Sequence, residues 1–357
     1  MLDISQLLQA IPGDNPSGQD PRLDTSATSL YWQMKEARNQ ARDIERASNI
    51  LSAASSTKSL WEKVSTLGEK ILLTQGKDLQ ISCWIIESLT RLSGFSGLKD
   101  GLSLSYGLVQ NFWDRLYPLP DKDKDFTSRV SFFYGLNGEE REGTLIAPIQ
   151  NSFIIQSKSG PSYTVWQYQQ SLNFGKVKDT SKQEQMLAGG VPKPQDLDLA
   201  IKETSTEFFQ NVSNDIQGCL DQLQLLDQSL TEKTRNQAPS FTNIKENLIV
   251  CLDYVEEFLK TRTVPLSQVT TKNSQASLIA EVTLSDRDSA FRSLEEIAAY
   301  FSAHEPQSPL PYLIRQVVKW GKMSLPDLLG ELIDDDRVQS SLSRLTGMEI
   351  KKPTEDA

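Results

Sequence analysis

Hydrophobic residues recur at helical spacing along most of this chain, and most regularly between residues 196 and 262. There, two stretches place apolar residues alternately three and four positions apart, the spacing of a helix packed along another helix. The connection at 236–240 is short, so the two stretches are predicted to form an antiparallel helical hairpin. The first stretch comprises Phe209, Val212, Ile216, Cys219, Leu223, Leu226 and Leu230, and the second Phe241, Ile244, Leu248, Cys251, Val255 and Phe258.

The N-terminal part also has helical spacing, but it is interrupted. A first short helix over 2–11 is predicted to end at Pro12-Gly13, and the following segment 15–21 is too rich in Pro, Gly and Asp for a regular element. Further helices are predicted over 27–48, around 61–71 and 79–89, and over 102–116. The glycines of Gly94-Phe95-Ser96-Gly97 indicate a turn between two helices.

The remaining segments define the predicted domain organisation of a mainly α protein. β-branched and aromatic residues at 152–156 and 163–167 predict a small β-hairpin near residues 150–168. Polar segments over 179–195 and 263–284 are interpreted as linkers, the second of them flexible. The expected order is a domain over 1–178, the linker 179–195, the helical hairpin 196–262, the linker 263–284 and a helical C-terminal domain over 285–350.

Composition narrows the possible functions. The chain has 357 residues, with 37 Lys and Arg against 47 Asp and Glu, so its formal net charge is −10. Without a basic patch, the chain is not expected to bind nucleic acid. No apolar run reaches the roughly 18–20 residues of a membrane helix, so no membrane insertion is expected. Three isolated cysteines and an N-terminus unlike a signal peptide favour the cytoplasm.

The sequence offers few candidate catalytic or metal-binding residues. His304 is the sole histidine, and its place before Glu305-Pro306 favours a helix-end role over catalysis. The triplet Asp334-Asp335-Asp336 is interpreted as the cap of a following helix rather than as a metal site. Cys219 and Cys251 fall on the heptad positions, where a small buried residue is expected. The sequence therefore predicts no catalytic residue, no metal and no cofactor.

Two long motifs resemble one family. Segment 15–21 (Asn-Pro-Ser-Gly-Gln-Asp-Pro), followed by 112–120 (Phe-Trp-Asp-Arg-Leu-Tyr-Pro-Leu-Pro), resembles the N-terminal ImpA-type domain of TssA proteins from bacterial type VI secretion systems. Segments 300–313 and 320–329 resemble the C-terminal domain of one TssA subclass. Gln307 stands where that family usually has His, a departure expected to alter one contact rather than the fold.

The resemblance implies a non-enzymatic, cytoplasmic scaffold that forms a homo-oligomeric ring. As partners it implies baseplate, sheath, tube and membrane-complex components of the secretion system. The residues it singles out as structural are Asn15, Pro16, Gly18, Asp20, Trp113, Asp114, Pro118 and Pro120. The large apolar residues of the C-terminal domain are more than so short a segment can easily bury, which indicates subunit contacts. The oligomerisation candidates are Tyr312, Leu313, Trp320, Met323 and Leu325.

Two other interpretations stay open at this point. One is a different helical adaptor or tether of another bacterial assembly. The other is a hydrolase that uses Ser17 in its loop as part of an anion site, which would need a base close to that serine.

Overall fold

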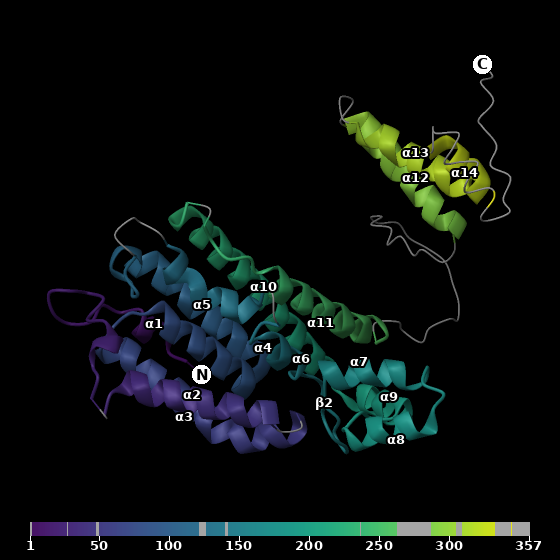
Figure 1. The fold of residues 1–357 in the computed structure, drawn as a ribbon. Coiled ribbons are helices and arrows are strands. Elements are labelled where there is room, and N and C mark those ends of the chain that lie inside the picture. Colours follow the sequence, from purple (N-terminus) through teal and green to yellow (C-terminus); the bar gives the residue numbers. More distant parts are fainter. Residues whose placement is uncertain are drawn as a thin grey trace, which may run out of the picture. The chain divides into compact units, whose positions relative to one another are not determined.

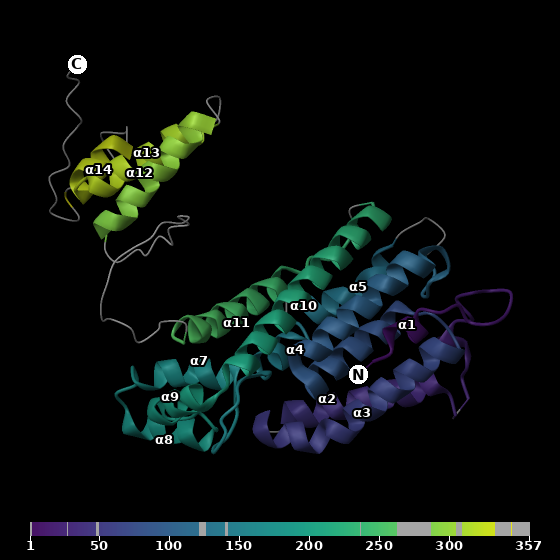
Figure 2. The same ribbon diagram turned by 180° about the vertical axis from the view of Figure 1, so that it is seen from behind.

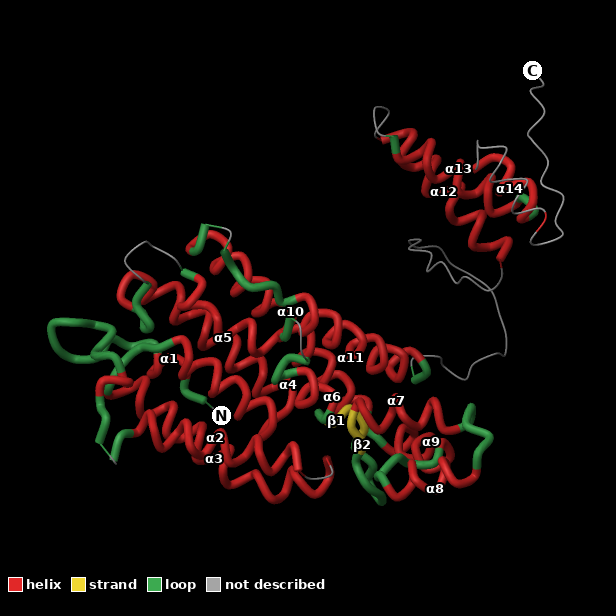
Figure 3. The backbone as a smooth tube through the Cα atoms, in the orientation of Figure 1, coloured by secondary structure: helices red, strands yellow, loops and turns green. Residues whose placement is uncertain are grey.

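The chain forms two compact units, one over residues 1–267 and one over 268–357. A computed structural model describes residues 2–26, 28–47, 50–120, 126–139, 142–235, 237–262, 287–304, 309–332 and 344. The predicted linker at 263–284 and the triplet Asp334-Asp335-Asp336 therefore lie outside the described residues. Figure 1 shows the elements of both units, and Figure 3 shows that helices dominate, which confirms the mainly α prediction.

The first unit is a layered helical bundle with a smaller helical subdomain. In its bundle, α2 packs on α3, α3 on α4, α4 on α10 and α10 on α11, an order that both views of the ribbon show (Figures 1 and 2). Helix α9 packs against α7 in the subdomain. The elements are α1 (Ile4–Leu7), α2 (Leu30–Ala47), α3 (Ile50–Thr74), α4 (Leu79–Phe112), α5 (Thr127–Asn137), α6 (Ile146–Gln150), β1 (Phe153–Ile155), β2 (Tyr163–Thr164), α7 (Val165–Phe174), α8 (Thr180–Ala188), α9 (Pro194–Glu203), α10 (Thr206–Lys233) and α11 (Thr242–Lys260), with 3-10 turns at Pro21–Leu23 and Trp113–Arg115.

Helix α4 is folded back on itself at Gly94. This glycine has a φ of +59°, a left-handed conformation that suits glycine because it lacks a Cβ atom. The two arms, 79–93 and 95–112, then run side by side. A Cβ atom on Gly97 would lie 2.1 Å from the Leu89 carbonyl oxygen, and one on Gly101 would lie 3.0 Å from the Ile86 Cα. The predicted helix-to-helix turn at Gly94–Gly97 is thus present, and small residues let its arms approach closely.

The heptad positions of α10 and α11 are all buried, as their spacing predicts. However, α10 packs along α4 as well as against α11. The Cys219 thiol donates to the Phe95 carbonyl oxygen, and the Gln110 amide donates to the Ser229 hydroxyl at 2.8 Å. The hairpin predicted as a separate module over 196–262 therefore shares one core with the N-terminal helices.

The segment predicted as a linker over 179–195 contains helix α8. Its first turn is capped by Asp179, whose carboxylate accepts the backbone N–H groups of Ser181 and Lys182. No α8 residue is buried, so the helix has no apolar periodicity from which it could be predicted. The predicted β-hairpin is confirmed: β1 and β2 pair antiparallel.

The second unit consists of α12 (Arg287–His304), α13 (Leu310–Lys322) and α14 (Leu325–Leu332) in its described residues. Helix α12 packs along α13, with Ala298 and Val318 buried. The two helices approach closely at Gly321, where a Cβ atom would lie 2.4 Å from the Phe291 ring. His304 ends α12, as its position before Glu305-Pro306 predicts. In the described part of the chain, no helix is long and apolar enough to cross a membrane.

The shared core predicts a position-specific response to a buried charge in α10. Leu223 is 3 % exposed and Leu225 is 38 % exposed. An aspartate at 223 would bury an unpaired carboxylate, so Leu223→Asp is expected to lower the free energy of unfolding by about 3–5 kcal/mol. The matched variant Leu225→Asp should change it by less than about 1 kcal/mol. Urea unfolding followed by circular dichroism measures both, and equal losses would contradict this packing.

Candidate functional site

The two N-terminal motifs meet at the turn between α3 and α4. The Gln19 N–H donates to the Gln75 carbonyl at 2.8 Å, and the Lys77 N–H donates to the Ser17 carbonyl at 2.9 Å. On the other side, the Tyr117 N–H donates to the Lys77 carbonyl at 2.9 Å and the Leu79 N–H to the Tyr117 carbonyl at 2.8 Å. Segments 15–22, 75–80 and 113–118 thus form one hydrogen-bonded unit, called here the signature junction.

A tight turn over Asn15–Gly18 opens the junction. The Gly18 N–H donates to the Asn15 carbonyl at 2.8 Å, and the Asn15 side-chain amide donates to the Gly18 carbonyl at 2.6 Å. The Tyr117 hydroxyl donates to the same Gly18 carbonyl at 3.2 Å. Gly18 has a φ of +71°, and a Cβ atom there would lie 2.2 Å from the Gln75 carbonyl oxygen. Position 18 therefore requires glycine for both its conformation and its close approach to α3.

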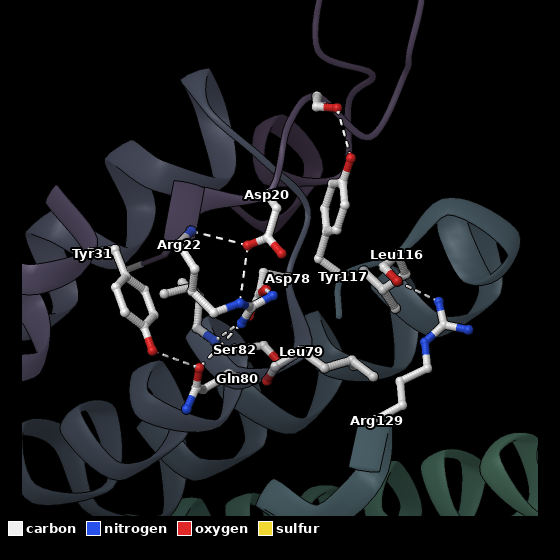
Figure 4. A network of polar contacts seen from close by, with 12 residues as sticks. Asp20, Arg22, Tyr31, Asp78, Leu79, Gln80, Ser82, Leu116, Tyr117 and Arg129 are labelled. Carbon is white, nitrogen blue, oxygen red and sulfur yellow. Dashed lines mark hydrogen bonds and ion pairs between the residues drawn. The ribbon is translucent and has the colours of Figure 1, made fainter. Parts of the chain in front are cut away.

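A buried carboxylate holds the centre of the junction. Asp78 is fully buried, caps α4 by accepting the Ile81 N–H at 3.0 Å, and accepts the Arg22 guanidinium at 2.7 Å (Figure 4). Asp20 pairs with the same guanidinium at 3.0 Å and caps the Pro21–Leu23 turn. Burial raises the pKa of Asp78 to about 6, although Arg22 and the Ile81 N–H both favour its charged form.

Lys77 connects the junction to α1 and α3. Its side-chain amine is buried and donates to the carbonyl oxygens of Leu7 and Leu72, each at 2.7 Å. The amine lies 5.4 Å from the centre of the Phe112 ring. Burial lowers the pKa of Lys77 to about 8. Two adjacent residues of opposite charge, Lys77 and Asp78, are therefore both buried where four segments meet.

The Phe-Trp-Asp-Arg motif is held from α5. The buried Arg129 guanidinium donates to the carbonyl oxygen of Leu116 (Figure 4). It also donates to the Trp113 carbonyl oxygen and lies 4.2 Å from the Trp113 ring centre. Burial lowers the pKa of Arg129 to about 10. Trp113 also packs against Phe126, at 5.7 Å between ring centres. A side chain from the next helix thus binds two backbone carbonyls of the turn that follows α4.

The structure brings together most, but not all, of the residues singled out by sequence. Asn15, Gly18 and Asp20 lie in the junction, and Pro118 follows Tyr117 through a cis peptide bond. Asp114 is exposed, and Pro120 lies partly exposed beyond the junction. The sequence analysis did not predict that Arg22, Lys77, Asp78 and Arg129 hold this junction. One signal could have identified Asp78, which stands directly before the first apolar residues of a helix, the position of an N-cap residue.

The junction offers little support for hydrolysis. A cleft of about 260 Å³ lies beside the junction, and the residues that line it include Pro16, Ser17, Trp113, Asp114 and Lys233. The Ser17 hydroxyl is buried and has no hydrogen-bond partner in the part of the chain that the structure describes. A general base must lie within hydrogen-bond reach of its nucleophile, and none of the described side chains hydrogen-bonds to this hydroxyl. Among the described residues, no cluster of His, Cys, Asp and Glu could hold a metal ion.

The C-terminal candidates lie partly on the surface of the second unit. Tyr312, Leu313 and Leu325 are 70 %, 59 % and 55 % exposed, which is unusual for side chains of this size. Trp320 and Met323 are partly buried, and the Trp320 indole N–H donates to Glu331 at 3.2 Å. Apolar side chains therefore remain uncovered within this unit.

Comparison with known proteins supports the resemblance to TssA proteins. Residues 8–138 match the family described as ImpA, N-terminal, type VI secretion system. The chain is similar to a solved N-terminal domain, including the conserved ImpA_N region, of the TssA component of the type VI secretion system from Burkholderia cenocepacia. That match has a TM-score of 0.60 and 21 % identity over 73 % of this chain and 95 % of the other. The first unit thus has the fold of an ImpA-type N-terminal domain.

The similarity extends beyond that domain. The type VI secretion system component TssA1 of Pseudomonas aeruginosa PAO1 is 23 % identical over 353 residues, covering 94 % of this chain and 96 % of the relative. Residues 8–138 thus carry the ImpA N-terminal region, and the chain as a whole is similar to TssA components of type VI secretion systems.

The turn at Gly18 generates a stability prediction. Gly18→Ala should lower the free energy of unfolding by about 2 kcal/mol or more, because it combines a positive φ with a backbone clash. The control is Gly175→Ala, since Gly175 has ordinary helical angles and open space around its Cα. Thermal unfolding of both variants measures the difference; a Gly18→Ala protein as stable as the control would contradict the geometry.

Lys77 generates a pH prediction. Its pKa falls from its ordinary 10.5 to about 8 on folding, so between these values the unfolded chain binds a proton that the folded chain does not. The contribution of Lys77 to the free energy of unfolding therefore rises with pH across this window. Relative to Lys77→Met, the unmodified protein should gain about 2 kcal/mol between pH 8 and 10 in urea unfolding. A difference between the two proteins that stays constant with pH would contradict the burial of the amine.

Proposed function

We propose that this chain is a non-enzymatic assembly scaffold of the type VI secretion system. Its C-terminal unit forms a homo-oligomeric ring, and the ring recruits or stabilises the baseplate and coordinates polymerisation of tube and sheath in the cytoplasm. The observation that carries the proposal is similarity to a TssA1 component over nearly the full length of both chains. A generic helical adaptor would not be expected to match such a component from end to end.

The physical properties of the two units support a division of roles. In the first unit, the polar side chains of the signature junction bond to backbone and to one another, which favours a structural role for the motif. In the second unit, apolar side chains are exposed on short helices that bury few residues of their own. Contacts between copies would cover these side chains, since small helical units need such burial for stability.

A ring would also change how the first unit binds. Several copies of that unit, each attached through the segment over 263–284, would be presented together, so weak contacts with baseplate, sheath, tube or membrane-complex components would add up. The domain order proposed from sequence, with an assembly domain over 285–350, fits this arrangement.

The oligomerisation proposal predicts a loss of assembly on removing exposed apolar side chains. Tyr312→Ser and Leu313→Glu should each reduce the oligomer to smaller species, because aromatic and apolar anchors commonly contribute about 2 kcal/mol or more at an interface. Trp320→Ala is expected to do the same, with the first unit still folded. Size-exclusion chromatography with light scattering on the full chain measures the mass.

The control for these variants is Leu23→Ser, which removes a side chain that is 74 % exposed in the first unit. This variant should keep the full oligomeric mass. A protein that is monomeric at micromolar concentration without any substitution, or variants of Tyr312 and Leu313 that keep the full mass, would contradict the proposal.

A further inference from the structure

One flank of α2 carries an exposed tryptophan and a row of positive charges. Trp32, Lys35, Asn39, Arg42 and Arg46 follow one another at steps of three and four residues, so they share one side of the helix. We call these residues the α2 row. Trp32 is 43 % exposed, and the Lys35 ammonium lies 4.7 Å from the centre of its ring. The α2–α3 pair lies on the side of the bundle away from α10 and α11 (Figures 1 and 2).

Neighbouring arginines already have carboxylate partners. Arg38 binds both carboxylate oxygens of the buried Glu87, and Arg91 binds both oxygens of Glu45 at 2.8 and 3.0 Å. These two carboxylates are therefore fully used inside the unit. In this part of the fold, each of these carboxylates is therefore paired with an arginine, as buried charges usually are.

Arg42 is the exception. Arg46 has Asp43 as a partner at 3.3 Å, but Arg42 makes no hydrogen bond or ion pair with any residue that the structure describes. The groups close enough to act on its charge are Arg38, Arg46, Arg91 and the already paired Glu87. Residues 48 and 49, between α2 and α3, and residues 50–54, at the start of α3, include no Asp or Glu. A half-buried guanidinium is thus surrounded mainly by like charges and lacks a carboxylate of its own.

Such an arrangement suits an anionic group supplied from outside. The planar guanidinium binds a carboxylate through two parallel hydrogen bonds, and burial strengthens that interaction. Burial, followed by the nearby arginines, lowers the pKa of Arg42, so an added carboxylate would relieve an unfavourable environment. Trp32 offers an apolar surface beside the charges, and Trp and Arg are the residue types that dominate interface energies.

We propose that the α2 row is a docking surface for an acidic amphipathic helix of a partner protein, with a carboxylate on Arg42 and an apolar side chain on Trp32. Charge complementarity selects this occupant: the row is positive on a chain whose net charge is −10. The exposed indole, moreover, matches an apolar side chain rather than a bare phosphate.

The binding test uses a fluorescein-labelled 15-residue helical peptide of Glu, Ala and Leu, followed by fluorescence anisotropy with the full chain. The chain should bind this peptide, binding should weaken as salt rises from 50 to 300 mM, and a peptide with Gln in place of Glu should bind weakly. Arg42→Gln and Trp32→Ser should each weaken binding about tenfold or more. Arg115→Gln, which alters an exposed arginine outside the row, should leave binding unchanged.

Three results would overturn the proposal. The first is that the acidic peptide does not bind. The second is that the Arg42→Gln chain binds it as tightly as the unmodified chain does. The third is that millimolar pyrophosphate or phosphatidylglycerol vesicles displace the peptide more readily than unlabelled peptide does. The last result would assign the row to phosphate groups or to a lipid surface instead.

A stability comparison separates docking from a structural role. Arg38→Gln should lower the melting temperature, because it leaves Glu87 buried without its guanidinium. Arg42→Gln should leave the melting temperature unchanged or raise it, because it removes like-charge repulsion on α2 and breaks no hydrogen bond or ion pair with the residues that the structure describes. Equal losses in the two variants would assign Arg42 to the fold and overturn the proposal.

Discussion

Burial of two adjacent opposite charges, Lys77 and Asp78, constrains the whole N-terminal unit. An ionised side chain can be buried only where other groups replace its contacts with water. The Lys77 amine donates to carbonyl oxygens of α1 and α3, and the Asp78 carboxylate accepts hydrogen bonds from Arg22 and from the first turn of α4. Their backbone groups bind the Asn15–Gly18 turn and Tyr117. Elements distant in sequence are therefore fixed together at one short turn.

This constraint explains how the two sequence motifs of the first unit take part in its fold. Glycine at position 18 and the residues around Tyr117 serve the contacts that close the junction, while α4, folded back at Gly94, carries its two arms into the core. The surfaces available for other molecules lie elsewhere. The proposed ones are exposed side chains of α13 and α14 in the second unit and the α2 row in the first.

The sequence predicted the structure best where buried residues recur at regular spacing within one helix. Every heptad position predicted in α10 and α11 is buried. The pattern could not show that α4 is a second partner of α10, because periodicity indicates a buried face and not the element that covers it. Helix α8 was missed because it buries nothing. Lys77 and Asp78 look like ordinary exposed residues before a helix; their burial depends on Arg22 and Tyr117, which lie far along the chain.

Native-state hydrogen exchange of the junction amides tests the central claim most directly. The N–H groups of Gln19, Lys77, Leu79 and Tyr117 each hydrogen-bond across the junction. If the junction is the constraint on which the unit depends, these four amides should exchange only through global unfolding, with one common free energy equal to that of the unit. Exchange of these amides at much lower free energies, through local opening of the 15–22 loop while the α4 and α10 core stays protected, would contradict the account.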